Sequence, residues 1–237
     1  MTHSWIFLHG INNTPAVWQP VIQRTAPPER AVSPTLPALD NIDAIATQLW
    51  PTLSASNLLV GHSFGGYLSL ALLAQRPECI RGIVLVNSHT RADSSQAQLI
   101  REQTAQQAET GQYASLVEAI TQRVYHPGNL SNIELMKGRL QQAAQYGADR
   151  FAAHQRACAA RSSHEETLRN FKGPKLVVAG DADQVITAQD QRAMAEAVQA
   201  EFVCIEGAGH MLPAEQPAKL AACIRRWAES FADNSLN

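Results

Sequence analysis

The stretch Gly61-His62-Ser63-Phe64-Gly65-Gly66-Tyr67 stands where one kind of sequence changes into another. A short and mostly apolar segment, Asn57 to Val60, precedes it, and a leucine- and alanine-rich segment that stops at Pro77 follows it. This order predicts a buried strand that turns sharply into a helix, with Ser63 at the turn. Side chains two positions either side of the serine would collide in such a turn, so the pattern G-x-S-x-G favours an exposed nucleophilic hydroxyl over an ordinary small-residue turn.

Other short segments with the character of buried strands occur toward both ends of the chain, and amphipathic segments lie between them. Asp40-Asn41 is expected to cap one helix that Pro51 ends, Thr187 and Asp190 form a candidate capping box, and Pro217 is a candidate first helical residue. This alternation predicts a doubly wound α/β fold with a mainly parallel sheet of about six strands. The expected strands are Ser4–Leu8, Glu29–Ser33, Asn57–Val60, Gly82–Val86, Lys175–Ala179 and Glu201–Ile205.

The middle of the chain, residues 89–171, contains no segment with strand character. Four helical segments are expected there, at about 94–109, 114–125, 132–146 and 148–161. Capping boxes are predicted at Ser131 with Glu134 and at Ser163 with Glu166. The sequence therefore predicts a core made of residues 1–88 and 172–237, with residues 89–171 inserted as an α-helical lid.

The composition limits the classes of partner that are expected. The chain has 237 residues, of which 45% are hydrophobic and 17% charged, and its formal net charge is -2. This balance favours neither a nucleic-acid partner nor a polybasic membrane contact, and no apolar stretch approaches the roughly 20 residues of a membrane span. No basic leader precedes the first apolar segment. The expected location is cytoplasmic.

The four cysteines, Cys79, Cys158, Cys204 and Cys223, are scattered singly, without a CxxC pair or a zinc-type Cys/His spacing. Reduced, packed thiols are therefore expected, in keeping with a cytoplasmic protein. No metal ion and no organic cofactor are predicted. Nothing in the sequence indicates an oligomeric state.

A nucleophilic serine needs a base, and the base needs an acid that orients it. His210 lies in a glycine-flanked loop just after the segment Phe202–Ile205, and it is the expected base. Two aspartates, Asp181 and Asp183, follow the strand candidate that ends at Ala179. Asp183 is the expected acid because Asp181 would sit closer to the strand end. The order along the chain is then Ser, Asp, His.

With these residues the chain resembles the α/β-hydrolase family over about residues 1–88 and 172–237. His9-Gly10-Ile11 looks like that family's HG loop, and Gly209–Pro217 is very similar to its C-terminal signature. The resemblance implies an oxyanion hole formed by the backbone N–H groups of Ile11 and Phe64. Trp18 matches a tryptophan often found after the HG loop.

Two departures from the family pattern are visible. Only about three residues precede the first strand candidate, so the family's initial antiparallel strands should be absent and the sheet wholly parallel. The glycine-rich loop that often follows a segment like Pro34–Pro37 is also trimmed, because Ala38–Asn41 leads straight into a helix. The trimmed loop is expected to leave one wall of the entrance more open.

The expected function is hydrolysis of a small ester, lactone or thioester through an acyl-enzyme. A C–C hydrolase, lyase or acyltransferase with the same three residues is the alternative, followed by a non-catalytic binding protein on this fold. The expected partner is a small-molecule acyl substrate. Arginines of the lid could meet an acidic substrate, but acids nearly balance bases there, so a solvated surface is the simpler interpretation. The candidate substrate contacts are Trp18, Ser88, His89, Ile120 and Phe151.

Overall fold

A computed structural model of the chain describes residues 3–25 and 30–232. Within these residues, six strands form one sheet in the order β2-β1-β3-β4-β5-β6, and every neighbouring pair is parallel. This confirms the predicted parallel α/β sheet. The strands are β1 (Ser4–Leu8), β2 (Ala31–Val32), β3 (Asn57–His62), β4 (Ile80–Val86), β5 (Lys175–Gly180) and β6 (Glu201–Ile205).

The second strand is shorter than predicted. Only Ala31 and Val32 pair with β1, although the sequence suggested a strand over Glu29–Ser33. Glu29 lies outside the described residues. Ser33 leaves the ladder, and its hydroxyl donates a hydrogen bond to the carbonyl oxygen of Phe7 at 2.9 Å.

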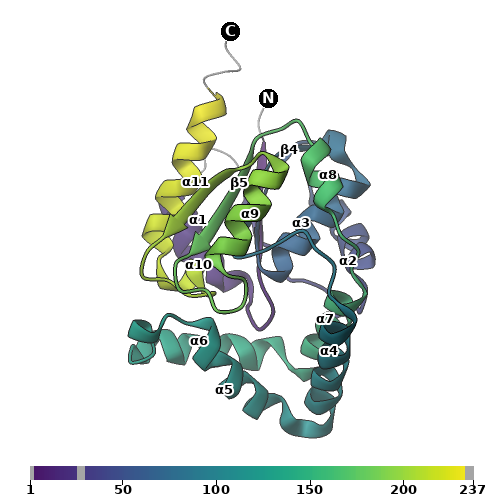
Figure 1. Cartoon of the computed structure of the whole chain (residues 1–237), viewed down its shortest axis with the longest axis vertical. Helices are drawn as coiled ribbons and strands as arrows, with labels where there is room; N and C mark the ends of the chain where they lie inside the picture. The colour runs from purple at the N-terminus through teal and green to yellow at the C-terminus, as the bar shows by residue number, and fades with distance from the viewer. Residues whose placement is uncertain (1–2, 26–29, 233–237) are drawn as a thin grey trace.

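Helices cover both faces of the sheet because the strands are apolar on both faces (Figure 1). In β1, Ile6 and Leu8 face the side that α2 (Ile42–Leu49), α3 (Phe64–Gln75) and α9 (Ala188–Val198) cover. Trp5 and Phe7 face the opposite side, which is covered by α1 (Gln19–Thr25) and α11 (Pro217–Ala232). Strand residues that alternate between two apolar layers are what a doubly wound sheet requires.

Helix ends follow the predicted signals at some positions and depart from them at others. Asn41 caps α2 through the amide of Ala44, Thr187 caps α9, and Pro217 begins α11, all as predicted. The box predicted at Ser131 is wrong, because the helix starts one residue later and Asn132 accepts the amide of Leu135 instead. The box predicted at Ser163 is also wrong, since the next helix is preceded by His164 and has no side-chain cap.

The segment between β4 and β5 is helical throughout its regular structure. Four of its helices lie together at one end of the molecule, opposite the end at which α11 finishes (Figure 1). The fifth, α8, packs instead against α3 and α9 of the core. Whether the segment 89–171 behaves as a separate lid stays a prediction. Its helices are α4 (Ser95–Gln107), α5 (Tyr113–Val124), α6 (Ile133–Tyr146), α7 (Ala148–Ala160) and α8 (Glu165–Asn170), and a kinked segment, Ala108–Gln112, joins the first two.

None of the helices in the described part of the chain is both long enough and apolar enough to cross a membrane.

The remaining α-helix, α10 (Leu212–Glu215), is short and follows the loop after β6. In a parallel sheet the loops that follow the strands all emerge at one edge, the carboxyl edge. Ser63, Asp183 and His210 all come after strands of this sheet, so the fold brings them to the edge that α4–α7 adjoin.

Candidate active site

Ser63 occupies a strained turn between β3 and α3. Its backbone has φ 51° and ψ -115°, a left-handed conformation that few residues other than glycine adopt. The neighbouring glycines are required by close backbone approach. A Cβ atom on Gly65 would lie 2.1 Å from the carbonyl oxygen of Leu8, and one on Gly61 would lie 2.4 Å from that of Gly65. The turn therefore explains the sequence pattern, and it aims the serine side chain away from the sheet.

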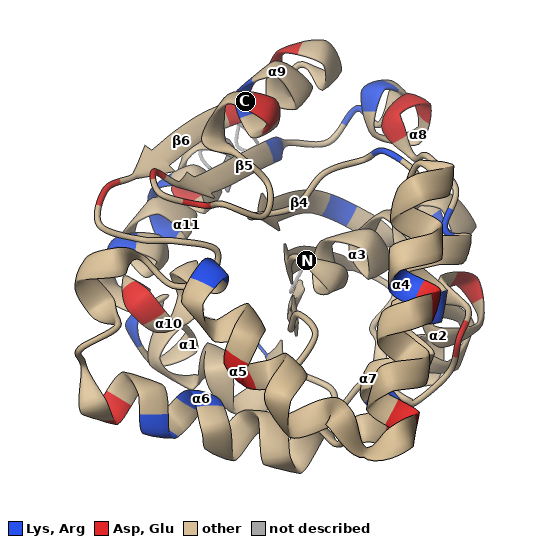
Figure 2. Cartoon of the chain, turned by 60° about the horizontal axis from the view of Figure 1, so that its bottom comes forward, with Lys and Arg blue, Asp and Glu red and all other residues tan. Residues whose placement is uncertain are grey.

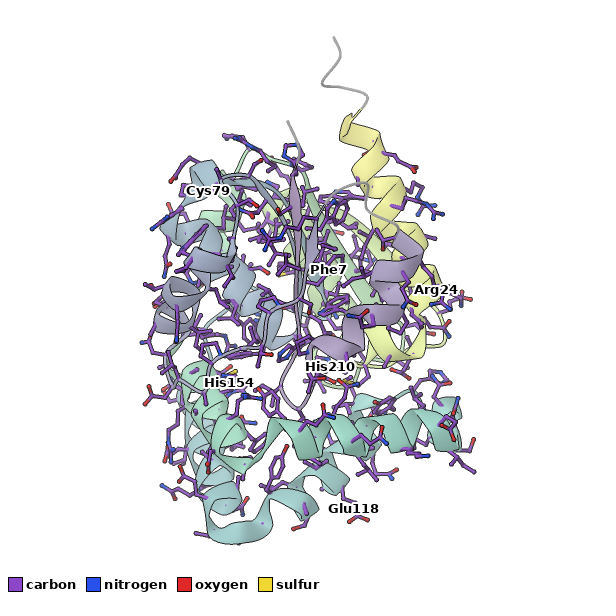
Figure 3. The ribbon with its side chains drawn as sticks, turned by 180° about the vertical axis from the view of Figure 1, so that it is seen from behind. Phe7, Arg24, Cys79, Glu118, His154 and His210 are labelled. Carbon is purple, nitrogen blue, oxygen red and sulfur yellow. The ribbon has the colours of Figure 1, made fainter. Side chains whose placement is uncertain are left out.

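The structure brings Ser63, His210 and Asp183 into one hydrogen-bonded line. The Nε2 atom of His210 lies 2.9 Å from Ser63 Oγ, and its Nδ1 atom lies 2.9 Å from Asp183 Oδ2. An ionised carboxylate only accepts, so Nδ1 carries the proton and Nε2 is left to accept from the serine hydroxyl. Figure 3 shows His210 where the core meets the inserted helices.

Asp183 is held in its charged form although it is buried. Burial by itself would raise the pKa of the carboxyl group, but His210 opposes this by charge and by hydrogen bonding. The backbone amides of Ile186 and Val185 also donate to Asp183 Oδ1, at 3.0 and 2.8 Å. The net effect is a pKa below the ordinary value for aspartate.

Asp181 has a different set of partners. Its Oδ1 atom accepts hydrogen bonds from the amides of Gly207 and Ala208, at 2.9 and 3.2 Å. These bonds shape the start of the loop that carries His210, but they do not bring the carboxylate to the imidazole. Of the two aspartates weighed from the sequence, the structure brings only Asp183 to His210.

The predicted oxyanion-hole residues flank the serine. Ile11 follows β1 and Phe64 is the first residue of α3, and both line the same cavity as Ser63. Within the described chain, neither backbone N–H donates to another backbone carbonyl. A Cβ atom on Gly10 would lie 2.9 Å from His62 Nδ1, so only glycine lets this loop pass so close to the serine turn.

A cavity of about 390 Å³ opens over the serine, between the carboxyl edge of the sheet and the helices α4–α7. Its apolar lining is Ile11, Phe64, Ala97, Ile100, Ile120, Val124, Phe151, Cys158, Val185, Ile186 and Met211. Its polar lining is Asn12, Asn13, His62, Ser63, Tyr67, Arg101, Thr104, Arg123, Arg139, Gln155 and His210. We call it the active-site cavity. Its volume suits a small molecule.

Residues 5–223 match the sequence profile described as the alpha/beta hydrolase family. The chain belongs to the α/β hydrolase family. No curated protein matches the sequence.

Several solved structures share this α/β hydrolase fold. A thermophilic esterase from Thermogutta terrifontis, in a malate-bound structure, has a TM-score of 0.89 and 23% identity, with coverage of 97% of this chain and 90% of the esterase. The enol-lactonase from Burkholderia xenovorans LB400 has a TM-score of 0.86 and 18% identity, covering 97% and 92% of the two chains. MenH from S. aureus has a TM-score of 0.86 and 18% identity, covering 97% and 95%. At these identities the similarity establishes the fold.

Two of the five candidate substrate contacts, Ile120 and Phe151, line the active-site cavity of this α/β hydrolase. The other three lie outside its lining. Trp18 is fully buried and packs on Phe7, at a ring-centroid distance of 5.3 Å. Ser88 is also fully buried, and its hydroxyl donates to the carbonyl oxygen of Ser63 at 2.9 Å, so it supports the serine turn from behind.

His89, the last of these candidates, lies behind the cavity wall. Its Nε2 atom is 3.2 Å from the hydroxyl of Tyr67, and its Nδ1 atom accepts the amide of Arg91 at 3.1 Å. Tyr67 is the residue that lines the cavity there. Burial, together with the charge of Arg161, lowers the pKa of His89 to about 4.

Asn87 supports the site and was not singled out from the sequence. It follows β4 with φ 46°, and its Nδ2 atom donates to the carbonyl oxygens of Gly209 and His210, at 3.0 and 2.8 Å. Its Oδ1 atom accepts the amide of Gly180 at 2.8 Å. One side chain thus ties the ends of β4 and β5 to the histidine loop. Its position directly after a buried strand was the sequence feature that could have identified it as a residue of the site.

His62 stands beside the catalytic candidate His210 but remains neutral. Burial lowers its pKa to about 3, with a further lowering from the neighbouring His210. Its Nε2 atom lies 2.7 Å from the carbonyl oxygen of His210, which only accepts, so Nε2 donates. A neutral His62 positions the backbone of His210 without adding a positive charge next to the imidazole.

The trimmed loop after Pro37 does not line the active-site cavity. The inserted helix α7 packs against the start of this loop, because His154 Nε2 donates to the carbonyl oxygen of Pro37 at 2.7 Å (Figure 3 labels His154). The hydroxyl of Tyr146 hydrogen bonds to His154 Nδ1. The more open wall expected there is thus occupied by α7, whose Phe151 and Gln155 line the cavity.

Acid should destabilise the fold through buried histidines such as His154. Burial lowers its pKa from 6.5 to about 4, so between these values the unfolded chain binds a proton that the folded chain does not. Stability is therefore expected to fall as the pH drops from about 6.5 toward 4. In His154→Gln, which keeps a donor for Pro37, the slope of the free energy of unfolding against pH should decrease by up to about 1.4 kcal/mol per pH unit. Urea unfolding at pH 7, 6 and 5 measures both slopes, and equal slopes would contradict this assignment.

Proposed function

We propose that this α/β hydrolase is a serine hydrolase that cleaves small ester-type substrates through an acyl-enzyme. The observation that carries the proposal is the line from Ser63 Oγ through His210 to Asp183, with both contacts at 2.9 Å. The line begins at the floor of a cavity of about 390 Å³. A hydroxyl, a base and an orienting carboxylate in this order are the requirements for nucleophilic attack on a carbonyl carbon.

In the first half of the reaction, Ser63 Oγ attacks the carbonyl carbon while its proton passes to His210 Nε2. The carbonyl π electrons move to the oxygen, and the backbone N–H groups of Ile11 and Phe64 are proposed to donate to this oxyanion. Each such donor contributes about 2.7–4 kcal/mol to the transition state. Collapse of the tetrahedral intermediate then breaks the bond to the leaving alcohol, which takes the proton from His210 Nε2.

In the second half, a water molecule attacks the acyl carbon of the ester formed at Ser63. His210 Nε2 accepts a proton from this water, and a second tetrahedral intermediate forms at the same oxyanion site. Its collapse releases the carboxylic acid and returns the proton to Ser63 Oγ. Throughout, the charge of Asp183 stabilises the imidazolium form of His210, which is the ion that both halves generate.

A substrate panel tests this function. We expect the purified protein to hydrolyse at least one class among short 4-nitrophenyl esters, acyl thioesters and lactones, with Ser63→Ala inactive on each. A panel in which wild type and Ser63→Ala show the same background rate would argue against hydrolysis. Products that join the acyl group to an added alcohol, or that arise by cleavage of a C–C bond, would favour the alternative acyltransferase or C–C hydrolase reactions.

Acyl-chain preference should depend on the inserted helices. Ile120 on α5 and Phe151 on α7 both line the active-site cavity, and Phe151 is fully buried. Ile120→Ala and Phe151→Ala are expected to change the relative kcat/KM across acyl lengths by about 1–3 kcal/mol, the usual value of one altered apolar contact. Ile133→Ala, on an exposed side chain of α6, is the matched control. A flat profile in both cavity variants would show that the insertion does not set this preference.

A further inference from the structure

Arg139 on α6 is a buried cation without a counter-ion. The residue is 3% exposed and lines the active-site cavity. No described aspartate or glutamate forms an ion pair with it. Burial lowers the pKa of its guanidinium group, yet arginine stays charged in proteins. A buried charge is costly unless something compensates it.

Only one nitrogen of the guanidinium group has a hydrogen-bond partner within the described chain. Its Nη1 atom donates to the carbonyl oxygen of Asn12 at 2.8 Å. Its Nε atom is buried and has no partner, and Nη2 donates to no residue in the described chain. The Nε–H and Nη2–H groups lie on one side of the planar group, and this pair of parallel donors fits the two oxygens of a carboxylate.

The other charged side chains that line the cavity are also positive. Arg101 and Arg123 also line it, and none of the described lining residues is acidic. Arg101 is paired with Asp93, which also binds Arg161 at 2.6 Å, so two arginines share one carboxylate. Along the inserted helices as a whole the two signs are mixed, because both basic and acidic positions occur on their ribbons (Figure 2). The excess of positive charge is therefore a property of the cavity.

We propose that Arg139 binds a carboxylate group of the substrate, so that the enzyme acts on ester-type compounds whose acyl part carries a free carboxylate. The inference rests on the proposed function. A carboxylate fits better than a phosphate dianion because Arg139 is the one buried, unpaired arginine among the described cavity-lining residues, and a carboxylate matches it with a single negative charge. The bond from Nη1 to Asn12, the neighbour of the proposed oxyanion donor Ile11, fixes the guanidinium beside the reacting centre.

Matched ester substrates test the inference in the whole enzyme. Mono-4-nitrophenyl glutarate carries a free carboxylate, and 4-nitrophenyl methyl glutarate has the same glutaryl group with that carboxylate masked as a methyl ester. We expect wild type to prefer the charged ester in kcat/KM, and Arg139→Gln to reduce this preference by about 10–150-fold, the range for a hydrogen bond to a charged group. Arg156→Gln, which removes a guanidinium paired with Glu102 and Glu109, is the matched control and should keep the preference.

A binding experiment separates this inference from the proposed function. Calorimetric titration of Ser63→Ala with succinate, glutarate or adipate should detect binding that Arg139→Gln in the same background weakens by a similar factor. Arg139→Lys, which keeps the charge but not the parallel donors, serves as a second variant if the glutamine variant does not fold, and it should also bind more weakly. Diacid binding that depends on Arg139 supports the inference even if wild type hydrolyses no ester.

Three results would overturn the inference. The first is the absence of diacid binding to Ser63→Ala while wild type hydrolyses neutral esters, which would leave the proposed function intact. The second is an unchanged preference for the charged ester in the folded Arg139 variants. The third is tighter binding of inorganic phosphate than of every diacid, which would assign the site to a different anion.

Discussion

Replacing Ser63 by alanine is expected to lower kcat for an activated ester by about six orders of magnitude, the loss observed when a triad serine is removed from a serine protease. The reason is that the first step forms a bond to Ser63 Oγ, and no other described hydroxyl contacts His210. The fold should survive, because the side chain of Ser63 makes only this hydrogen bond while the strained turn is set by the surrounding glycines. Circular dichroism and thermal unfolding check the fold, and stopped-flow or long-time assays measure the rate.

Covalent labelling gives an independent readout of the same prediction. A fluorophosphonate should attach to Ser63, and mass spectrometry of the digested protein should locate it there. Ser69→Ala is the matched control, because Ser69 lies on α3 only six positions later and its hydroxyl donates to Gly65 O at 2.9 Å. It should still be labelled. A label on another residue, combined with an active Ser63→Ala protein, would remove Ser63 from the proposed mechanism.

Much of the fold and the three central residues could be predicted because they depend on local sequence. Buried parallel strands are continuous apolar runs, so β1, β3, β4, β5 and β6 were identified within a few residues. The serine turn has a local glycine signature, and His210 and Asp183 follow strands directly. The short β2 was harder, because an edge strand of two residues has little apolar surface to bury.

Residues whose roles depend on tertiary position could not be predicted. Arg139 is buried only because α6 crosses the loop after β1, and the sequence of α6 alone reads as a solvated helix. The near balance of acids and bases in the insertion concealed the positive charge of the cavity, because none of the described acidic residues lines it. His89 and Ser88 were expected in the pocket from their place after β4, but Tyr67 covers the first and the serine turn covers the second.

The second large effect is expected on kcat, when Asp183, one of the two aspartates after β5, is replaced by asparagine. Asp183→Asn is expected to lower kcat by about 10⁴-fold, as when a triad aspartate is neutralised. An asparagine can keep the bonds from Val185 and Ile186 through Oδ1, so that its Nδ2 donor faces His210 Nδ1. The imidazole must then carry its proton on Nε2, which points at Ser63 and can no longer accept the hydroxyl proton. The imidazolium ion also loses its neighbouring negative charge.

Asp181→Asn is the matched control for this substitution, because it makes the same chemical change two residues away. The Oδ1 atom of an asparagine can still accept the amides of Gly207 and Ala208, so the loop that carries His210 should keep its shape. We expect kcat within about 3-fold of wild type, since the loss of a charge on a surface carboxylate costs little. Steady-state kinetics on one ester, with thermal unfolding of both variants, makes the comparison. If Asp181→Asn lost more activity than Asp183→Asn, the acid would be Asp181, and the hydrogen bond between Asp183 and His210 would be structural.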